Sequence, residues 1–400
     1  MKLSICIPTH HGRRETLKFL LETILNEVYE FKLESLVQIC ISDNASTDGT
    51  EDLVKSFSNA HAVKIKYYRQ NSNTGIKNFF KVIDLADTEY CWLIGSDDAI
   101  IPNGINNVLQ CLVSYPDVPG VTVNKLNFDR SLSRMVGPDH DLVLPPNPNN
   151  TRYLIGEREI LDSLFLAFCY ISSHIFQKKV WDSVIAQQGI KRILSYPVFP
   201  HVFILSEIAK AEKKWVWGKD YCVIQRLDNF SFVTEVSSKK IDFAEQVTAD
   251  LVRIALDVFG DKDDIYSRII FKVFLIYWNP WFTLNYIVQP DVDMETIKSA
   301  RNNCVIWFGD SVIFRLITYP IFFIPKKILS FILMLMLKLR GFIKINCGNR
   351  IILAPMSRFV HFVLQVFRFE RWEKASHDDM HKASDSFLKV KLQIASKYLK

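Results

Sequence analysis

Short apolar runs alternate with segments of helical periodicity near the start of the chain. Four runs have the length of strands: Leu3–Ile7, Val37–Ser42, Val63–Tyr68 and Tyr90–Ile94. Between the first two, apolar residues of Arg14–Tyr29 recur every three or four positions, which predicts an amphipathic helix. A second helix is predicted to begin at Thr47 or Asp48 and to run to Phe57. A third covers residues 76–86. This order predicts an α/β fold with a mostly parallel sheet.

Polar residues gather just after each predicted strand. Ligands of open α/β sheets bind beyond the carboxyl ends of the strands, so a site is expected in these loops. The candidates are Pro8, Thr9, Asp43, Ser46, Asp48, Asn73, Gly75, Ser96, Asp97 and Asp98. Some of them also suit a purely structural role. Asp43 can close a turn, and Ser46 or Asp48 can cap the next helix. The segment Asn73–Gly75 can form an ordinary turn.

Asp97 and Asp98 are harder to explain by local structure. Two adjacent carboxylates after an apolar strand repel each other unless a cation or hydrogen bonds compensate. Carboxylate oxygens suit Mg²⁺ or Mn²⁺, and bound Mg²⁺ often contacts substrate phosphates as well. The first predicted strand is followed by neither GxxxxGK[ST] nor GxGxxG, which disfavours a P-loop or a Rossmann dinucleotide site.

The composition excludes a disordered chain, because 49% of the 400 residues are hydrophobic. The charge is uneven. Residues 301–400 hold 17 Lys and Arg against 6 Asp and Glu, whereas the first 300 residues hold 32 against 37. A basic and apolar end favours an anionic membrane surface, with no nucleic acid as partner. The eight cysteines are dispersed, which predicts buried free thiols in a reducing compartment.

Four motifs together resemble the family 2 glycosyltransferases of the GT-A fold. They are SICIPTHHGRRETL, ICISDNASTDGTEDLV, YYRQNSNTGIKNFF and CWLIGSDDAIIPNGI, in the order and at the spacing of that family. The resemblance covers residues 1–115 well and residues 116–235 loosely. The GSDDAI and NTG-x-x-NF forms are most similar to the branch that builds bacterial O-antigen and other surface polysaccharides, which includes abequosyltransferase-like members.

The resemblance implies an enzyme, a hexosyl- or deoxyhexosyltransferase of class EC 2.4. Such an enzyme transfers a sugar with inversion from a nucleotide-diphosphate sugar to a hydroxyl of a glycan acceptor. Thr9 is then expected at the nucleotide and Asp43 at its base. The implied substrate-binding residues are Pro8, Thr9, Asp43, Ser46, Asn73, Gly75, Asn78, Ser96, Asp97 and Asp98.

Asp97 and Asp98 match the metal-binding carboxylates of that family, so the resemblance implies Mn²⁺ or Mg²⁺ as cofactor. The match departs at Gly95, where the family has its first acidic residue. Asp97 is therefore the expected metal ligand, and Asp98 supports the metal or a sugar hydroxyl. A cation there would neutralise the charge that grows on the diphosphate as the sugar bond breaks.

Inversion requires a base on the face opposite the leaving group, to take the proton of the acceptor hydroxyl. His201, at the start of a predicted helix, stands where the family usually has an aspartate. Histidine suits this task because its ordinary pKa lies near the working pH. The alternative is a histidine that caps or packs the helix start. Glu207 and His174 are weaker candidates.

The chain is expected to divide into a GT-A domain over 1–235, a helical extension over 236–304 and an amphipathic helical region over 305–400. The extension is predicted to contain helices at Phe243–Phe259 and Ile265–Trp278. Residues 374–400 are expected to form a polar amphipathic helix.

Three apolar stretches in the last region are flanked by lysine and arginine: Val312–Pro325, Ile328–Leu339 and Phe359–Phe369. None of these runs reaches the roughly 18 residues of a spanning helix. Helices that lie in the membrane interface are therefore expected. A helical bundle against the catalytic domain or another subunit, and a transmembrane hairpin, are the alternatives.

These features predict an enzyme in the cytoplasm, peripheral on the inner face of the cell membrane, with a polyprenyl-diphosphate-linked acceptor. The apolar C-terminal region is also compatible with a homo-oligomer. Two other classes stay open. A nucleotidyltransferase has a similar sheet, but its Gly-rich first loop is replaced here by PTHHGRR. A non-catalytic sugar-binding scaffold would account for the departures at Gly95 and His201.

Overall fold

The computed structural model describes residues 2–136, 150–227, 240–334 and 377–396. Its contacts divide the chain into two compact units. The first unit is Met1–Asn229 together with Glu373–Lys400, and the second is Phe230–Trp372. The second unit begins close to the predicted boundary at 235 and contains the predicted boundary at 304, and the end of the chain belongs to the first unit.

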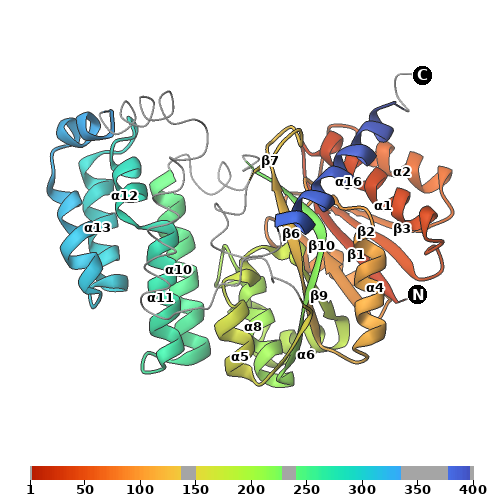
Figure 1. Ribbon diagram of the computed structural model, residues 1–400, viewed down its shortest axis with the longest axis horizontal. Coiled ribbons are helices and arrows are strands. Elements are labelled where there is room, and N and C mark those ends of the chain that lie inside the picture. The colour runs from red at the N-terminus through yellow and green to blue at the C-terminus, as the bar shows by residue number, and fades with distance from the viewer. Residues whose placement is uncertain (1, 137–149, 228–239, 335–376, 397–400) are drawn as a thin grey trace. The chain divides into compact units, whose positions relative to one another are not determined.

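One ten-stranded mixed sheet forms the centre of the first unit, in the order β3-β2-β1-β4-β9-β6-β10-β5 (Figure 1). The strands in that order are β3 (Lys64–Arg69), β2 (Val37–Asp43), β1 (Leu3–Thr9), β4 (Tyr90–Leu93), β9 (His174–Gln177), β6 (Gly120–Phe128), β10 (Lys214–Arg226) and β5 (Ala99–Ile100). Two short strands, β7 (Met135–Val136) and β8 (Arg152–Ile155), pair with β6 and β10. The first four strands are mutually parallel, as the sequence predicts.

Helices follow the early strands as their apolar spacing predicts. Those of the first unit are α1 (Arg14–Glu30), α2 (Thr50–Ala60), α3 (Lys77–Asp84), α4 (Gly104–Ser114), α5 (Glu157–Leu164), α6 (Lys178–Gln188), α7 (Ile190–Ile193) and α8 (Pro200–Glu212). Helices α1, α2 and α4 share one apolar core with the sheet. Strands β1 and β2 are buried along their whole length, which explains their uninterrupted apolar runs. Cys6, Cys40 and Cys91 are free thiols inside this fold.

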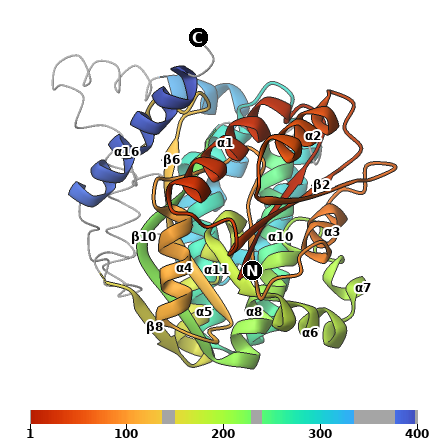
Figure 2. The same ribbon diagram turned by 90° about the vertical axis from the view of Figure 1, so that its right-hand side faces the viewer.

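The last helix, α16 (His377–Ser396), packs on the first unit. Figure 2 shows α16 close to α1 and β6. The ring of Phe387 lies 6.2 Å from that of Phe19 on α1 and 5.2 Å from that of Phe128 on β6, measured between centroids. A helix was expected here, but as part of a separate region beginning at residue 305.

The second unit is helical. It contains α10 (Lys240–Phe259), α11 (Asp264–Tyr277), α12 (Pro280–Ile287) and α13 (Met294–Phe308), followed by a π-helical turn (Phe314–Thr318), a 3₁₀ turn (Tyr319–Phe323) and a short helix (Lys326–Met334). Trp278 is fully buried at its centre, and its indole N–H donates to the Thr248 hydroxyl at 2.8 Å.

The last described stretch of the second unit exposes large apolar side chains, including Leu316 at 73%, Phe323 at 56% and Phe331 at 58%. Within the described residues, no single helix is long and apolar enough to cross a membrane. One pair, Phe314–Phe323 with Lys326–Met334, reaches that length and composition together but is bent by 112° at its break. The predicted stretch Phe359–Phe369 lies outside the described residues.

Gly120 marks the point where β6 passes under a buried tryptophan. A Cβ at this position would lie 2.2 Å from the Trp215 ring, which is fully buried and donates its indole N–H to Thr122. We expect Gly120→Ala to lower the free energy of unfolding by about 3 kcal/mol, because the ring has no room to move. In contrast, a Cβ at Gly218 on β10 meets nothing closer than 3.5 Å. Gly218→Ala is therefore the control, expected to change stability by less than about 1 kcal/mol in urea unfolding.

Candidate active site

The ends of β1 and β2 place Thr9 beside Asp43, since the two residues are partners in the parallel register. The backbone N–H of Asn44 donates to the Thr9 carbonyl at 2.9 Å, which continues the pairing into the loop. The hydroxyl oxygen of Thr9 is buried and has no hydrogen-bond partner within the described part of the chain. Pro8 precedes it in the same buried strand end.

Asp43 organises the loop after β2. Its Oδ1 accepts hydrogen bonds from the backbone N–H of Ser46, at 3.0 Å, and from the Ser46 hydroxyl. Its Oδ2 accepts from the Tyr67 hydroxyl at 2.7 Å. Burial and the neighbouring Asp43 carboxylate raise the pKa of Tyr67 far above its ordinary value. Asp48 joins two loops, because it accepts from the Gly12 N–H at 2.7 Å and from the Thr50 hydroxyl at 2.6 Å.

Asn78, at the start of α3, ties three segments together. Its side-chain amide donates to the carbonyls of Thr9 and Ser42 at 3.2 and 2.9 Å, and its oxygen accepts from the Ser42 hydroxyl at 2.7 Å. The buried side chain therefore holds both strand ends against α3.

The loop before α3 is held by a second amide pair. The Asn44 amide donates to the Asn73 side-chain oxygen at 2.6 Å, and Asn73 also accepts from the Gly75 N–H at 2.8 Å. Gly75 has a φ of +56°, a left-handed conformation that glycine adopts at low cost. The structure thus brings Thr9, Asp43, Asn73, Gly75 and Asn78 to one rim of the sheet.

Asp97 and Asp98 follow β4 and have different surroundings. The side chain of Asp97 is 23% exposed and forms an ion pair with Arg13, whose Nη1 lies 3.1 Å from Oδ2. Asp98 is buried and accepts from the hydroxyls of Tyr170 and Ser172 at 2.9 and 2.6 Å. Burial, and then the charge of Asp97, raises the pKa of Asp98 to about 7. The pair is therefore one partly exposed carboxylate and one buried carboxyl group whose surroundings favour its protonated form.

Arg226, at the end of β10, closes the other side of the Asp97–Asp98 turn. Its Nε donates to the Asp97 carbonyl at 2.9 Å, and its backbone N–H donates to Asp98 Oδ1 at 3.4 Å. Burial lowers the pKa of Arg226, while the two aspartates raise it. Two guanidinium groups thus compensate the adjacent carboxylates.

Gly95 lies close against both carboxylates. A Cβ at this position would lie 3.1 Å from an oxygen of Asp97 and 3.1 Å from an oxygen of Asp98. A side chain here would thus point at the carboxylate pair. Ser96, between Gly95 and Asp97, is buried.

No group of three or more His, Cys, Asp or Glu side chains is arranged to hold a metal ion in the described ranges. The carboxylates of Asp97 and Asp98 are the acidic pair at the rim that a divalent ion would use. Of the two, Asp97 offers the more accessible oxygens, because Asp98 is enclosed by Tyr170 and Ser172.

His201 lies in the first turn of α8 and is 5% exposed. Its ring centroid is 6.4 Å from that of Phe79 and 5.7 Å from that of Phe199. Nε2 lies 3.5 Å from the Cys169 carbonyl, whereas Nδ1 is buried without a hydrogen-bond partner among the described residues. Burial lowers the pKa of His201 to about 4, so the ring is neutral at pH 7.

The two weaker base candidates are engaged elsewhere. His174 is fully buried on β9, 3.0 Å from the Thr122 hydroxyl and 2.9 Å from the Ala167 carbonyl. Burial lowers its pKa to about 3. Glu207 accepts from Gln188 at 2.6 Å and from Lys210 at 3.0 Å. Both arrangements are those of structural residues.

Several residues that surround the carboxylates were not among the sequence candidates. Arg13 lies in the PTHHGRR loop, where an arginine after the first strand end is a usable signal. Arg226, Tyr170 and Ser172 are separated from Asp98 by 128, 72 and 74 positions. No local sequence pattern indicates a contact between residues so far apart in the sequence.

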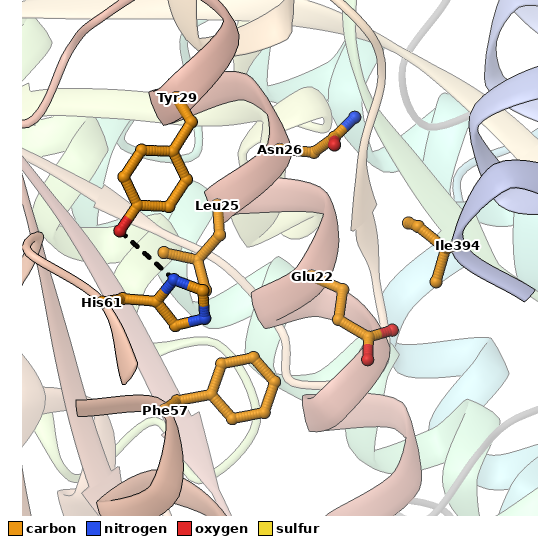
Figure 3. Close-up of a pocket in the computed structure, with 7 residues that line it drawn as sticks. All are labelled: Glu22, Leu25, Asn26, Tyr29, Phe57, His61 and Ile394. Atoms are coloured by element: carbon orange, nitrogen blue, oxygen red, sulfur yellow. Dashed lines mark hydrogen bonds between the residues drawn. The ribbon is translucent and has the colours of Figure 1, made fainter. Parts of the chain in front are cut away.

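The described structure also contains a cavity of about 370 Å³ (Figure 3). It is lined by Glu22, Leu25, Asn26, Tyr29, Phe57, His61 and Ile394. These residues belong to the second half of α1, the end of α2 and the loop after it, and α16, which lead away from the carboxyl ends of the strands. None of the candidate site residues borders it.

Comparison with known proteins identifies the class. The model of glycosyl transferase family 2 matches residues 4–154. The chain is 32% identical to the abequosyltransferase RfbV of Salmonella typhimurium over 247 residues, which cover 60% of this chain and 71% of that protein. A glycosyltransferase of Mycoplasma pneumoniae, the MG060 homolog, is 31% identical over 27% of this chain and 36% of its own length.

The chain therefore belongs to glycosyltransferase family 2, and it is a glycosyltransferase of class EC 2.4. Its fold agrees with that of solved members of the GT-A class. The structure of S. aureus TarS 1–349 with UDP-GlcNAc has a TM-score of 0.52 at 12% identity, over 77% of this chain and 81% of that one. Membership in this family disfavours the nucleotidyltransferase alternative.

Proposed function

We propose that this glycosyltransferase moves a sugar, with inversion, from a nucleotide-diphosphate sugar to a hydroxyl of a lipid-linked glycan acceptor. The process we assign is the synthesis of a bacterial surface polysaccharide such as O-antigen. The identity to an abequosyltransferase over 71% of its length supports the surface-polysaccharide role. The nucleotide sugar bound by TarS, a protein of the same fold, supports the donor class.

The observation that carries the proposal is the partly exposed Asp97 carboxylate at the strand ends, with the buried Arg13 and the half-buried Arg226 beside it. The 23% exposure of its side chain leaves oxygen atoms within reach of a ligand, while Arg13 and Arg226 fix the turn that carries it. Adjacent loops supply the nucleotide subsite in this proposal. The buried Thr9 hydroxyl without a partner and the backbone of the Asn73–Gly75 turn line that side of the rim.

A divalent cation fits the Asp97–Asp98 pair, since one accessible carboxylate together with donor phosphates is a usual Mg²⁺ or Mn²⁺ environment. Asp97 would hold the ion, with Asp98 behind it. The ion would supply Lewis-acid stabilisation of the leaving diphosphate. The chain's own contribution is to keep Asp97 oriented through Arg13 and to keep Asp98 hydrogen-bonded to Tyr170 and Ser172.

His201 is the base in this proposal. Its Nδ1 has no hydrogen-bond partner in the described structure and carries a lone pair in the tautomer protonated at Nε2. Because the ring is 5% exposed, the acceptor hydroxyl reaches it only if the neighbouring Phe79 or Phe199 ring moves aside.

Membrane attachment through the second unit completes the proposal. Leu316, Phe323 and Phe331 are exposed apolar side chains in a segment followed by basic sequence. Such a surface suits the interface of an anionic bilayer and would place the enzyme at the inner face of the cell membrane, near a polyprenyl-diphosphate-linked acceptor.

Asp97→Asn should abolish donor turnover. The wild-type protein is incubated with a panel of UDP-, GDP-, CDP- and dTDP-sugars, and release of nucleoside diphosphate or monophosphate is measured. We expect one of these donors to be turned over, and its turnover to depend on Mn²⁺ or Mg²⁺. The variant should lower this rate by about 100-fold or more. Asp52→Asn, on the exposed side of α2, is the matched control. Full turnover by Asp97→Asn, or full turnover in EDTA, would contradict the proposed site.

His201→Gln should lower kcat by about 100-fold or more while the KM for the donor stays unchanged, because a base acts on the acceptor proton. The wild-type pKa near 4 means that the imidazole is already neutral above pH 5. As the pH is lowered, kcat/KM should therefore decrease with a midpoint near pH 4, and not near the ordinary histidine pKa of about 6.5. Near-normal turnover of the variant would remove His201 from the mechanism.

The full-length protein should sediment with phosphatidylglycerol vesicles and much less with phosphatidylcholine vesicles. Lys327→Glu with Phe331→Ser should reduce the bound fraction, because the pair removes one exposed charge and one exposed apolar side chain. Lys219→Glu, an exposed lysine of the first unit, is the control. Equal sedimentation of all three proteins would exclude this surface as the attachment site.

A further inference from the structure

Helix α16 holds a loop that reaches the candidate active site. The ammonium group of Lys391 donates to the carbonyls of Ser131 and Leu132 at 2.8 and 2.9 Å. Both carbonyls belong to the loop Asp129–Arg134, which follows β6. One turn before Lys391, the Phe387 ring is fully buried beside Phe128.

The loop Asp129–Arg134 has a conformation that needs external support. Leu132 has a φ of +53°, in the left-handed region that side chains other than glycine, asparagine and aspartate rarely adopt. Its side chain is 1% exposed and belongs to the same apolar cluster as Phe387 and Met380 of α16. Helix α16 thus supplies both the apolar cover of Leu132 and the donor for its carbonyl.

The same loop is in direct contact with Arg226. The Arg226 Nη1 donates to the Arg130 carbonyl at 2.5 Å, and the Arg226 Nε donates to the Asp97 carbonyl at 2.9 Å. One guanidinium group therefore links the loop to the turn of the two carboxylates. A continuous series of contacts runs from Lys391 through the loop and Arg226 to Asp97.

We propose that α16 is a positioning element for the catalytic carboxylates, with Lys391 as its principal polar contact. Lys391 and Phe387 fix the Asp129–Arg134 loop, and the loop carbonyl of Arg130 fixes Arg226 against the Asp97–Asp98 turn. Lys391 touches neither donor nor acceptor in this arrangement. The inference rests on the proposed role of Asp97 and extends it to the far end of the sequence.

Electrostatics agree with this geometry. Burial and the nearby Arg226 charge lower the pKa of Lys391, while Asp129 raises it. Asp129 is itself engaged within the loop, where its carboxylate accepts from the backbone N–H and the hydroxyl of Ser133, both at 2.8 Å. The ammonium group is therefore directed at two carbonyls and not at a competing carboxylate partner.

The test is a comparison of lysine variants in the full-length enzyme. We expect Lys391→Met to lower kcat about tenfold, with the donor KM and the melting temperature nearly unchanged, because a small displacement of the carboxylates weakens catalysis more than binding. Lys391→Arg keeps two donors and should restore most of kcat. Lys389→Met, at an exposed position of the same helix, should behave as wild type.

A double-mutant cycle separates positioning from general destabilisation. In an Arg226→Gln background the link to Asp97 is already broken, so Lys391→Met should have little further effect on kcat. Equal kcat values for Lys391→Met and Lys389→Met, or full additivity with Arg226→Gln, would overturn the inference.

Measuring Asp97→Asn in the same assay separates a failure of the proposed role of α16 from a failure of the proposed active site. An inactive Asp97→Asn enzyme together with a fully active Lys391→Met enzyme overturns only the role of α16. An active Asp97→Asn enzyme overturns the proposed site, and the inference with it.

Discussion

Two carboxylates side by side at the end of a buried strand are the constraint on which the site depends. Burial favours the neutral form of Asp98, and the charge of Asp97 acts in the same direction, so both raise the pKa of Asp98. Arg13 and Arg226, which are far apart in the sequence, lie beside this turn and compensate the charge that remains. The strand pairing makes this possible, because β1 pairs with β4, which precedes the turn, and β10 pairs with β5, which follows it.

The rim beside these carboxylates is built from side chains whose hydrogen bonds are directed at the backbone. Asn78 binds two strand-end carbonyls, and Asp43 holds the loop that follows β2. Each of these side chains has a structural task that can be stated from its contacts. The rim is thus held by contacts within the chain, so a ligand that binds there would need little ordering of the loops.

The sequence predicted the elements whose residues follow a clear local pattern. Strands β1 to β4 and helices α1 to α3 were located from periodicity, because each buried strand is an apolar run and each helix has one apolar stripe. The carboxylate pair and the amide and glycine positions of the rim were found through strand ends. The sequence did not predict Arg226, Tyr170 and Ser172 as site residues, because their contacts with Asp98 join segments that share no local pattern. The packing site of α16 was not predicted for the same reason, since the apolar face of a helix does not indicate which surface it covers.

The return of α16 to the first unit makes the catalytic unit discontinuous in the sequence. The chain leaves this unit at Asn229 and rejoins it at Glu373, after the whole helical unit. During synthesis, domains begin to fold from the N-terminus while the remainder is still being made. The sheet and its rim can therefore assemble early, but the loop beside Arg226 gains its cover only after residues 377–396 have been made. A shortened protein that keeps only the sheet would thus retain the fold of the rim and lose the part of the chain that completes it.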